Sequence, residues 1–114
     1  IVVGTGNKVE DFGVGFFTKY GDGGVDISPI ADCVKTEVWH MGRLLGVDEK
    51  IIDAAPTDGL WDDGRNDEDQ LGMTYVDLEM AMVGMGPVSN VEKFREIKRK
   101  NIHKINPIPV CKVS

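Results

Sequence analysis

Cysteine, histidine and long apolar runs are scarce in this chain of 114 residues, and each scarcity excludes a class of protein. Cys33 and Cys111 lie far apart and form no CxxC pair, so neither a zinc motif nor a disulfide framework is indicated. Two isolated thiols are typical of a reduced cytoplasmic protein. No apolar run approaches the roughly 18 residues that a membrane span needs. We therefore expect a cytoplasmic protein with no membrane partner.

Positive charge is also in deficit, because the net charge of the chain is −6. This balance argues against a general nucleic-acid binder. The charges are unevenly placed: residues 48–79 contain eleven acidic and two basic residues, whereas residues 93–114 contain seven basic residues and one acidic residue. The basic stretch has two interpretations, a solvated helix face or a surface for phosphate or an acidic partner.

Length and composition are typical of one globular domain with a modest core, since 41% of the residues are hydrophobic and 28% are charged. The chain begins with Ile1 rather than methionine, inside the apolar, β-branched run Ile1-Val2-Val3. Such a run predicts the end of a buried parallel strand. We expect the chain to be one part of a longer polypeptide.

Apolar spacing and capping residues predict a helix-rich remainder. Asn7 and Glu10 have the spacing of a capping box that opens a short helix. Ser28-Pro29 resembles a helix start, and apolar residues at spacings of three and four continue that helix to Gly46. Further helices are expected over 48–53, from 67, over 74–82 and over 88–102, with an acidic loop over 58–66 and an extended C-terminus.

The segment Gly15–Ile27, GFFTKYGDGGVDI, combines aromatic residues, a glycine-rich turn, a lysine and isolated carboxylates. Glycines and charges suit a core element badly, because they forfeit burial and helix propensity. They suit a polar ligand, since glycine lets the backbone approach and an aromatic face can stack. Lys19 and Asp26 can bind groups of opposite charge. We interpret the segment as a functional loop.

This segment, together with later motifs, resembles the ammonia-dependent NAD synthetase family, within the ATP pyrophosphatase superfamily. The resemblance continues through APTDGL at 55–60, DEDQLGMTY at 67–75 and His103-Lys104, in the family's order and over nearly the whole chain. It implies an α/β fold, a Rossmann-like parallel sheet flanked by helices, of which this chain holds the helix-rich C-terminal half.

The resemblance also implies a reaction. Family members convert deamido-NAD, ATP and ammonia into NAD, AMP and pyrophosphate, through an adenylated nicotinate, and they work as homodimers with Mg²⁺. The family's pyrophosphate-binding loop, of the Ser-Gly-Gly-x-Asp-Ser type, lies upstream of the equivalent of Ile1 and is absent from this sequence. Residues 1–114 therefore match only the C-terminal part of one synthetase domain and should be inactive alone. Two alternatives stay open: a glutamine-dependent synthetase, or a non-catalytic nucleotide-binding or dimerisation fragment.

Four residues match family contacts to ATP and its metal. Thr5, Lys35 and Thr57 match ATP contacts, and Glu10 matches a magnesium ligand. Each also has a structural interpretation. Thr5 can satisfy local backbone, Thr57 can be an N-cap in a Pro-Thr turn, and Glu10 can close the capping box. Lys35 lies near a predicted helix N-terminus, where a positive charge is unfavourable, and this conflict hints at an anionic partner.

Four further residues match family contacts to deamido-NAD. They are Lys19, Asp26, His103 and Lys104. Lys19 could instead be a solvated loop lysine, but its place between aromatic residues and a glycine turn favours a ligand. Asp26 could cap a turn. His103 and Lys104 end the last predicted helix, where cations suit the helix dipole without any ligand. No catalytic triad is indicated. A general base for ammonia would have to be one of the loop carboxylates, and the sequence does not select one.

Overall fold

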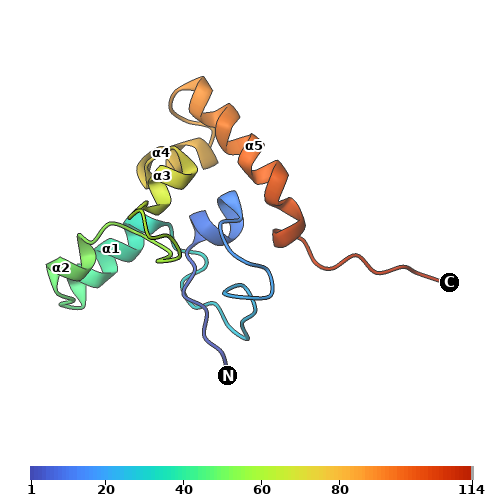
Figure 1. The fold of residues 1–114 in the computed structure, drawn as a ribbon, viewed down its shortest axis with the longest axis horizontal. Coiled ribbons are helices and arrows are strands. Elements are labelled where there is room, and N and C mark those ends of the chain that lie inside the picture. The colour runs from blue at the N-terminus through green and yellow to red at the C-terminus, as the bar shows by residue number, and fades with distance from the viewer. Residues whose placement is uncertain (114) are drawn as a thin grey trace.

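The computed structural model describes residues 1–113 and contains little strand. Figure 1 shows a central helix, η1, with the remaining helices arranged around it. The elements in chain order are η1 (Val9–Val14), α1 (Lys35–Leu44), α2 (Glu49–Ile52), α3 (Asp67–Leu71), α4 (Tyr75–Met82) and α5 (Val88–Ile105). The helices predicted over 48–53, 74–82 and 88–102 are confirmed, the last of them extended to Ile105.

The N-terminal run pairs in parallel but is not buried. Within residues 1–113, its regular pairing is a single parallel bridge between Val3 and Ile27. Ile1 is 99% exposed and Val3 is 54% exposed, so the prediction of a buried strand is wrong for this chain. Side chains of such a run are buried only when both faces of the sheet are covered, and Val2 and Val3 remain more than half exposed.

The first long helix begins later than the sequence predicted. Residues 28–33 form turns, and α1 starts at Lys35. The carbonyl oxygen of Cys33 accepts the Lys8 N–H at 2.8 Å, which ties the end of this turn to the start of η1. The Glu37 carboxylate accepts the Val34 N–H at 2.9 Å and caps the helix. Contact with the chain ahead of η1 therefore overrides the Ser-Pro start signal.

The predicted capping box at Asn7 is present, but the helix it opens is a π-helix. Asn7 Oδ1 accepts the N–H of Val9 at 2.9 Å, and Glu10 Oε2 accepts the Asn7 N–H at 3.2 Å. η1 ends at Gly15, whose φ of 68° is left-handed and favours glycine. Short π-helices are rare and are frequent at functional sites. The turn fixes the Glu10 side chain beside the end of the N-terminal run.

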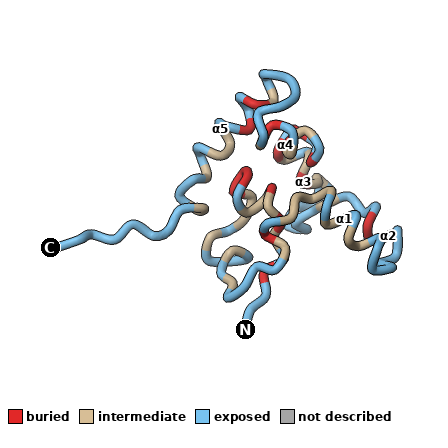
Figure 2. Tube along the Cα trace, turned by 180° about the vertical axis from the view of Figure 1, so that it is seen from behind, coloured by how far each residue is buried: buried red, intermediate tan, exposed pale blue. Residues whose placement is uncertain are grey.

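The core lies between η1, α4 and α5. Figure 2 shows that the fully buried residues are concentrated on these elements and on α3. Leu78 and Val9 are 0% exposed, and Tyr75 is 1% exposed. The whole buried cluster consists of Val9, Val14, Leu71, Met73, Tyr75, Leu78, Ala81, Val91 and Phe94. No side chain of α1 is fully buried in the described chain, so its apolar face is only partly covered.

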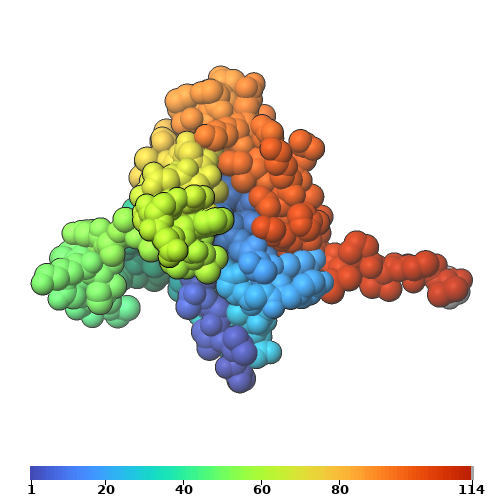
Figure 3. Space-filling view, in the orientation of Figure 1, coloured from blue at the N-terminus to red at the C-terminus, as the bar shows by residue number. Residues whose placement is uncertain are grey.

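The molecule is more extended than a compact domain of its length. Its radius of gyration is 15.4 Å, against roughly 13 Å for a compact chain of about 100 residues. Figure 3 shows the cause, because the N-terminal residues, the α1–α2 arm and the C-terminal tail all project from the body. Among residues 1–113, no helix is both long enough and apolar enough to cross a membrane.

Glu79 joins α4 to the start of α1, and its removal should destabilise the protein. Its carboxylate accepts the Thr36 N–H at 2.9 Å and the Thr36 hydroxyl at 2.8 Å. Glu79→Ala should lower the free energy of unfolding of the complete gene product by about 1–2 kcal/mol, because a free helix N–H and a hydroxyl lose their acceptor. Urea unfolding followed by circular dichroism measures the change. Glu92→Ala, at an exposed position on α5, is the control and should leave stability unchanged.

Candidate functional site

The glycine-rich segment packs tightly because two of its glycines allow close approach. A β-carbon on Gly15 would lie 2.6 Å from the Asn101 β-carbon of α5, and one on Gly23 would lie 2.5 Å from the Phe17 ring. Any larger residue at either position must displace its neighbour. The backbone of the segment is therefore held against α5, and its polar side chains border two clefts.

The first of these, the Glu10 cleft, has a volume of about 730 Å³. It brings together the predicted ATP and metal residues Thr5, Glu10, Lys35 and Thr57, with Asp67 at the start of α3. These side chains come from the N-terminal run, η1, α1, the 58–66 loop region and α3. Residues separated by more than fifty positions in the sequence therefore meet in one cavity.

A hydrogen-bonded cluster forms part of the Glu10 cleft. The buried Tyr75 hydroxyl lies 2.7 Å from Glu10 Oε1 and 3.1 Å from Asp67 Oδ2. Lys35 Nζ lies 3.5 Å from Glu10 Oε1 and 5.0 Å from the centroid of the Tyr75 ring. The side chains of Lys35 and Glu10 are 20% and 16% exposed, so this ion pair is shielded from bulk water. The Tyr75 hydroxyl thus lies between two carboxylates, and one of them, Glu10, also pairs with Lys35.

Burial controls the protonation of this cluster. It raises the pKa of the Tyr75 phenol far above its ordinary value, with further contributions from the hydrogen bond to Glu10 and the two neighbouring negative charges. The Tyr75 phenol therefore keeps its proton at any physiological pH and acts as a hydrogen-bond donor. Burial also raises the pKa of the Asp67 carboxyl, and the Tyr75 hydrogen bond opposes this effect. The positive charge of Lys35 also opposes the increase in pKa, whereas the negative charges of Glu10 and Asp58 add to it.

The second cavity, the Lys19 cleft, has a volume of about 480 Å³ and contains Lys19, Asp26 and Lys104. Lys19 Nζ donates to the carbonyl oxygens of His103 at 2.7 Å and Asn106 at 3.1 Å. These carbonyls lie at the C-terminus of α5, where the helix dipole favours a cation. A lysine ammonium has three N–H donors, so one remains for a ligand. Asp26 Oδ2 accepts the Val2 N–H at 2.6 Å, which is a contact with the N-terminal run and not the cap of a local turn.

The two clefts are neighbours because Phe17, Asp22 and Lys104 line both of them. Lys104 Nζ donates to the Gly15 carbonyl at 3.1 Å and lies 6.0 Å from the centroid of the Phe17 ring. The α5 terminus is thereby attached to the start of the glycine-rich segment. We call Phe17, Asp22 and Lys104 the shared wall.

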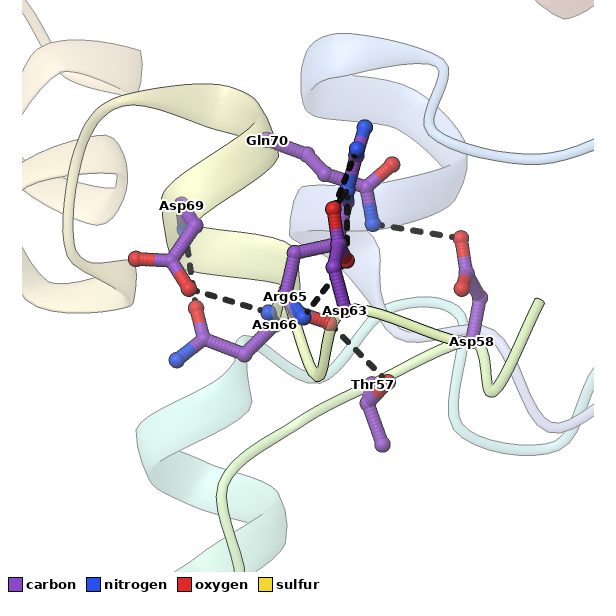
Figure 4. Close-up of polar contacts among 7 residues, drawn as sticks. All are labelled: Thr57, Asp58, Asp63, Arg65, Asn66, Asp69 and Gln70. Atoms are coloured by element: carbon purple, nitrogen blue, oxygen red, sulfur yellow. Dashed lines mark hydrogen bonds and ion pairs between the residues drawn. The ribbon is translucent and has the colours of Figure 1, made fainter. Parts of the chain in front are cut away.

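The 58–66 loop borders the Glu10 cleft and is braced by its own side chains. Figure 4 shows these contacts: the Thr57 hydroxyl donates to the Arg65 carbonyl at 3.3 Å, and Gln70 Nε2 donates to Asp58 Oδ2 at 3.2 Å. The Arg65 guanidinium pairs with Asp63 and lies 4.2 Å from the centroid of the Trp61 ring. No helix of the described chain begins at Thr57, so it is not an N-cap; its hydroxyl accepts the Gly59 N–H at 3.1 Å in a local turn, and the residue lines the cleft.

His103 is the one predicted site residue that neither cleft includes. Its side chain is exposed and is absent from the described linings of both cavities, although its carbonyl holds Lys19. Asp67 and Tyr75 were missed by the sequence reasoning. The sequence interpretation placed Asp67 only as an acid in the first turn of a helix, and Tyr75 only as a helix residue. Both lie in the DEDQLGMTY motif, and that motif was the signal that could have identified them.

The donor set of the Glu10 cleft fits a hard cation only in part. Carboxylate oxygen is the ligand that Mg²⁺ prefers, and Glu10 supplies one such group. Both of its oxygens already accept a hydrogen bond, from Asn7 and from Tyr75. Within residues 1–113, no cluster of three or more His, Cys, Asp or Glu residues could hold a metal. Glu10 could therefore complete a metal site whose other ligands are phosphates, water or groups outside this chain.

Comparison with known proteins accounts for this constellation. The family model described as NAD synthase matches residues 1–111. The chain belongs to the NAD synthase family. It is 47% identical over 105 residues to the NH(3)-dependent NAD(+) synthetase of Carboxydothermus hydrogenoformans, covering 91% of this chain and 42% of that protein. It is 42% identical over 118 residues to the Archaeoglobus fulgidus protein of the same name, covering 99% of this chain and 47% of that protein.

A solved structure agrees with the family assignment. The NMN synthetase of Francisella tularensis superposes with a TM-score of 0.87 at 34% identity, over 96% of this chain and 45% of that structure. The chain thus has the fold of the corresponding part of an NAD synthase-type protein, as a helix-rich partial domain. It spans about half the length of the curated relatives it matches.

Proposed function

We propose that these 114 residues form the C-terminal part of an ammonia-dependent NAD synthetase, which amidates deamido-NAD at the expense of ATP. The observation that supports this most is the pair of adjoining clefts. One contains Glu10 and Lys35, which suit a metal-bound nucleotide, and the other contains Lys19 and Asp26. Relatives named as NH(3)-dependent NAD(+) synthetases support the same activity.

The proposed chemistry requires the two clefts to communicate. The nicotinate carboxylate of deamido-NAD attacks the α-phosphorus of ATP, pyrophosphate leaves, and the resulting acyl-adenylate is then attacked by ammonia, with AMP leaving. The first step brings two anions together, so positioned cations are needed. Lys35 would face the triphosphate, and Lys104 in the shared wall would lie between the substrates. Mg²⁺, when bound at Glu10, would offset negative charge on the phosphate oxygens.

The remaining predicted residues take supporting roles in this proposal. Thr5 and Thr57 would bind ATP from the rim of the Glu10 cleft, with the 58–66 loop as a lid. Lys19 and Asp26 would bind deamido-NAD, as would the His103-Lys104 pair at the end of α5. The Val3–Ile27 bridge would be the edge of a Rossmann-like sheet completed by the rest of the protein. We also propose a cytoplasmic homodimer, supported by exposed Leu44 and Leu45 on α1 and its C-cap.

The direct test supplies the complete gene product with deamido-NAD, ATP, Mg²⁺ and ammonium, and measures NAD and AMP. Equal amounts of NAD and AMP are expected, and failure to form NAD would overturn the proposal. In a second reaction, glutamine replaces ammonium. NAD formation with glutamine but not with ammonium would favour the glutamine-dependent alternative. Nicotinate mononucleotide replaces deamido-NAD in a third, because one similar structure is an NMN synthetase.

The isolated 114-residue chain is assayed beside the complete gene product. NAD formation by the complete product alone supports a synthetase of which this chain is a part. Binding of nucleotide without turnover by either protein would favour the non-catalytic alternative.

Replacing Lys19 by methionine should weaken deamido-NAD binding. The methionine keeps the apolar stem but loses the ammonium that α5 positions. A charge-assisted hydrogen bond is worth enough for the KM for deamido-NAD to rise about tenfold, with the KM for ATP unchanged. Steady-state kinetics of the complete gene product check this. Lys112→Met, at an exposed position in the tail, is the matched control. An unaltered KM for deamido-NAD in the Lys19 variant would refute the role.

A further inference from the structure

The Tyr75 side chain is held in one place by its surroundings. It is the first residue of α4, whose N-cap Thr74 accepts the Asp77 N–H at 3.1 Å. The residue is 1% exposed, and its ring packs edge-on against the Trp39 ring of α1, with 6.3 Å between the ring centroids. A side chain enclosed in this way keeps one rotamer. The hydroxyl at its end therefore has a fixed position.

The hydroxyl proton of Tyr75 is directed at Glu10. The phenol oxygen lies 2.7 Å from Glu10 Oε1, which is the usual length of a hydrogen bond from a hydroxyl to an oxygen, and 3.1 Å from Asp67 Oδ2. A phenol has one proton to donate. The shorter contact therefore identifies Glu10 Oε1 as its acceptor.

The same oxygen of Glu10 faces Lys35 at a longer distance. Lys35 Nζ lies 3.5 Å from Glu10 Oε1, whereas a charge-assisted bond from nitrogen to oxygen is about 2.7–2.9 Å long. The ammonium also lies 5.0 Å from the centroid of the Tyr75 ring, within range of cation–π attraction. Tyr75 therefore acts on Lys35 twice. Its hydroxyl occupies the carboxylate oxygen at the shorter distance, and its ring attracts the ammonium.

We propose that Tyr75 is a positioning residue for Lys35, which keeps the ammonium out of a closed ion pair with Glu10 and available in the Glu10 cleft. This inference rests on the proposed function, in which Lys35 binds the phosphates of ATP. A closed ion pair would compete with the phosphate oxygens for the same N–H donors. Without the hydroxyl, Glu10 Oε1 would be open to Lys35, and the pair would close.

The place of Lys35 in the fold agrees with this role. It is the first residue of α1 and lines the Glu10 cleft. The helix dipole disfavours a cation at this end of a helix and favours a nearby anion. A lysine that is only loosely paired there can turn its N–H donors to an anionic ligand, and a triphosphate is such a ligand.

Tyr75→Phe in the complete gene product tests the inference, because phenylalanine keeps the ring beside Lys35 and removes only the hydroxyl. Isothermal titration calorimetry without deamido-NAD gives the Kd for ATP. This Kd should rise about fivefold, which corresponds to the loss of one hydrogen bond to a ligand. In steady-state kinetics, the KM for deamido-NAD should stay unchanged. An unaltered Kd for ATP overturns the inference.

The deciding measurement repeats the substitution in a Lys35→Met background. A positioning residue acts only through its target, so Tyr75→Phe should not change the Kd for ATP further once the ammonium is absent. An increase by the same factor in both backgrounds would overturn the inference, because Tyr75 would then act on ATP independently of Lys35.

Thr36→Val is the matched control. It also removes a hydroxyl that donates to a carboxylate, that of Glu79 at 2.8 Å, but Thr36 lies outside the described lining of the Glu10 cleft. The Kd for ATP should be unchanged in this variant. An equal rise in the Thr36 and Tyr75 variants would overturn the inference, since loosened packing of α1 against α4 would explain both.

A second variant covers the case in which Tyr75→Phe does not fold. Tyr75→Met then takes its place in both backgrounds, because the flexible methionine side chain fills irregular gaps in a core. The same Kd values decide the outcome. Absence of NAD formation by the wild type would refute the proposed function, whereas the calorimetric cycle tests the action of Tyr75 on Lys35 without turnover.

Discussion

Replacing Glu10 by glutamine should lower the rate of deamido-NAD adenylation by the complete gene product by about 100-fold or more. The expected size is that of losing one positioned electrostatic contact to a developing charge. Glutamine is nearly isosteric and is as good as glutamate in a capping box, so the bond to the Asn7 N–H is retained. What is lost is the negative charge that faces Lys35 and that would hold Mg²⁺. Exchange between ATP and pyrophosphate, measured across a range of Mg²⁺ concentrations, gives the effect.

Glu37→Gln is the matched control for this experiment. Glu37 caps α1 by accepting the Val34 N–H, which is the same structural role that Glu10 has at η1, but it lies outside the lining of the Glu10 cleft. The Glu37 variant should exchange at the wild-type rate. If both variants lose exchange equally, Glu10 acts through the fold alone and its proposed metal role is wrong.

Truncation of Leu78 to alanine should destabilise the protein more than any other substitution considered for this chain. Leu78 is 0% exposed and belongs to the cluster between η1, α4 and α5. Removal of a large buried aliphatic side chain leaves a cavity and costs about 2–5 kcal/mol of the free energy of unfolding. This is a large fraction of the roughly 5–15 kcal/mol by which domains are stable.

Val76→Ala supplies the comparison on the same helix. Val76 is 51% exposed, so its truncation should change stability by about 0.5 kcal/mol or less. Denaturant unfolding of both variants of the complete gene product measures the difference. Equal effects at Leu78 and Val76 would show that α4 does not pack in the protein as described.

Most of the helical structure was predictable from the sequence because local signals decide it. Thr74 caps α4 by accepting the Asp77 N–H at 3.1 Å, and Asn66 caps α3 by accepting the Asp69 N–H at 2.8 Å. Both caps are read directly from residue type and spacing. The start of α1 was not predictable, since it is set by a hydrogen bond between Cys33 and Lys8, twenty-five positions earlier.

The candidate site was predictable only where a family motif marks it. The resemblance assigned Glu10 and Lys35 to ATP and its metal, and the structure places both in one cleft. Side-chain packing supplied the rest. Tyr75 is on a different helix from Asp67 and is 65 positions from Glu10, yet its hydroxyl reaches both carboxylates. No spacing rule predicts such a contact, because the tertiary packing of α4 against η1 creates it.

The proposed substrate-binding lysines show the same difference between what the motifs predict and what tertiary packing adds. From the sequence, Lys19 was interpreted as a loop residue that binds a ligand. The sequence did not predict that two carbonyl oxygens at the end of α5 accept hydrogen bonds from the Lys19 side chain. Lys104 was assigned to deamido-NAD alone, whereas the structure places it in the shared wall between both clefts. One basic residue at the end of α5 can thus contact both proposed substrates.

A crystal structure of the complete gene product with deamido-NAD and a non-hydrolysable ATP analogue is the most direct test of the whole account. The account predicts the ATP analogue in the Glu10 cleft, with its phosphates beside Lys35, and deamido-NAD in the Lys19 cleft. The nicotinate carboxylate should meet the α-phosphate at the shared wall. Density for either ligand on a surface away from these two clefts would contradict it.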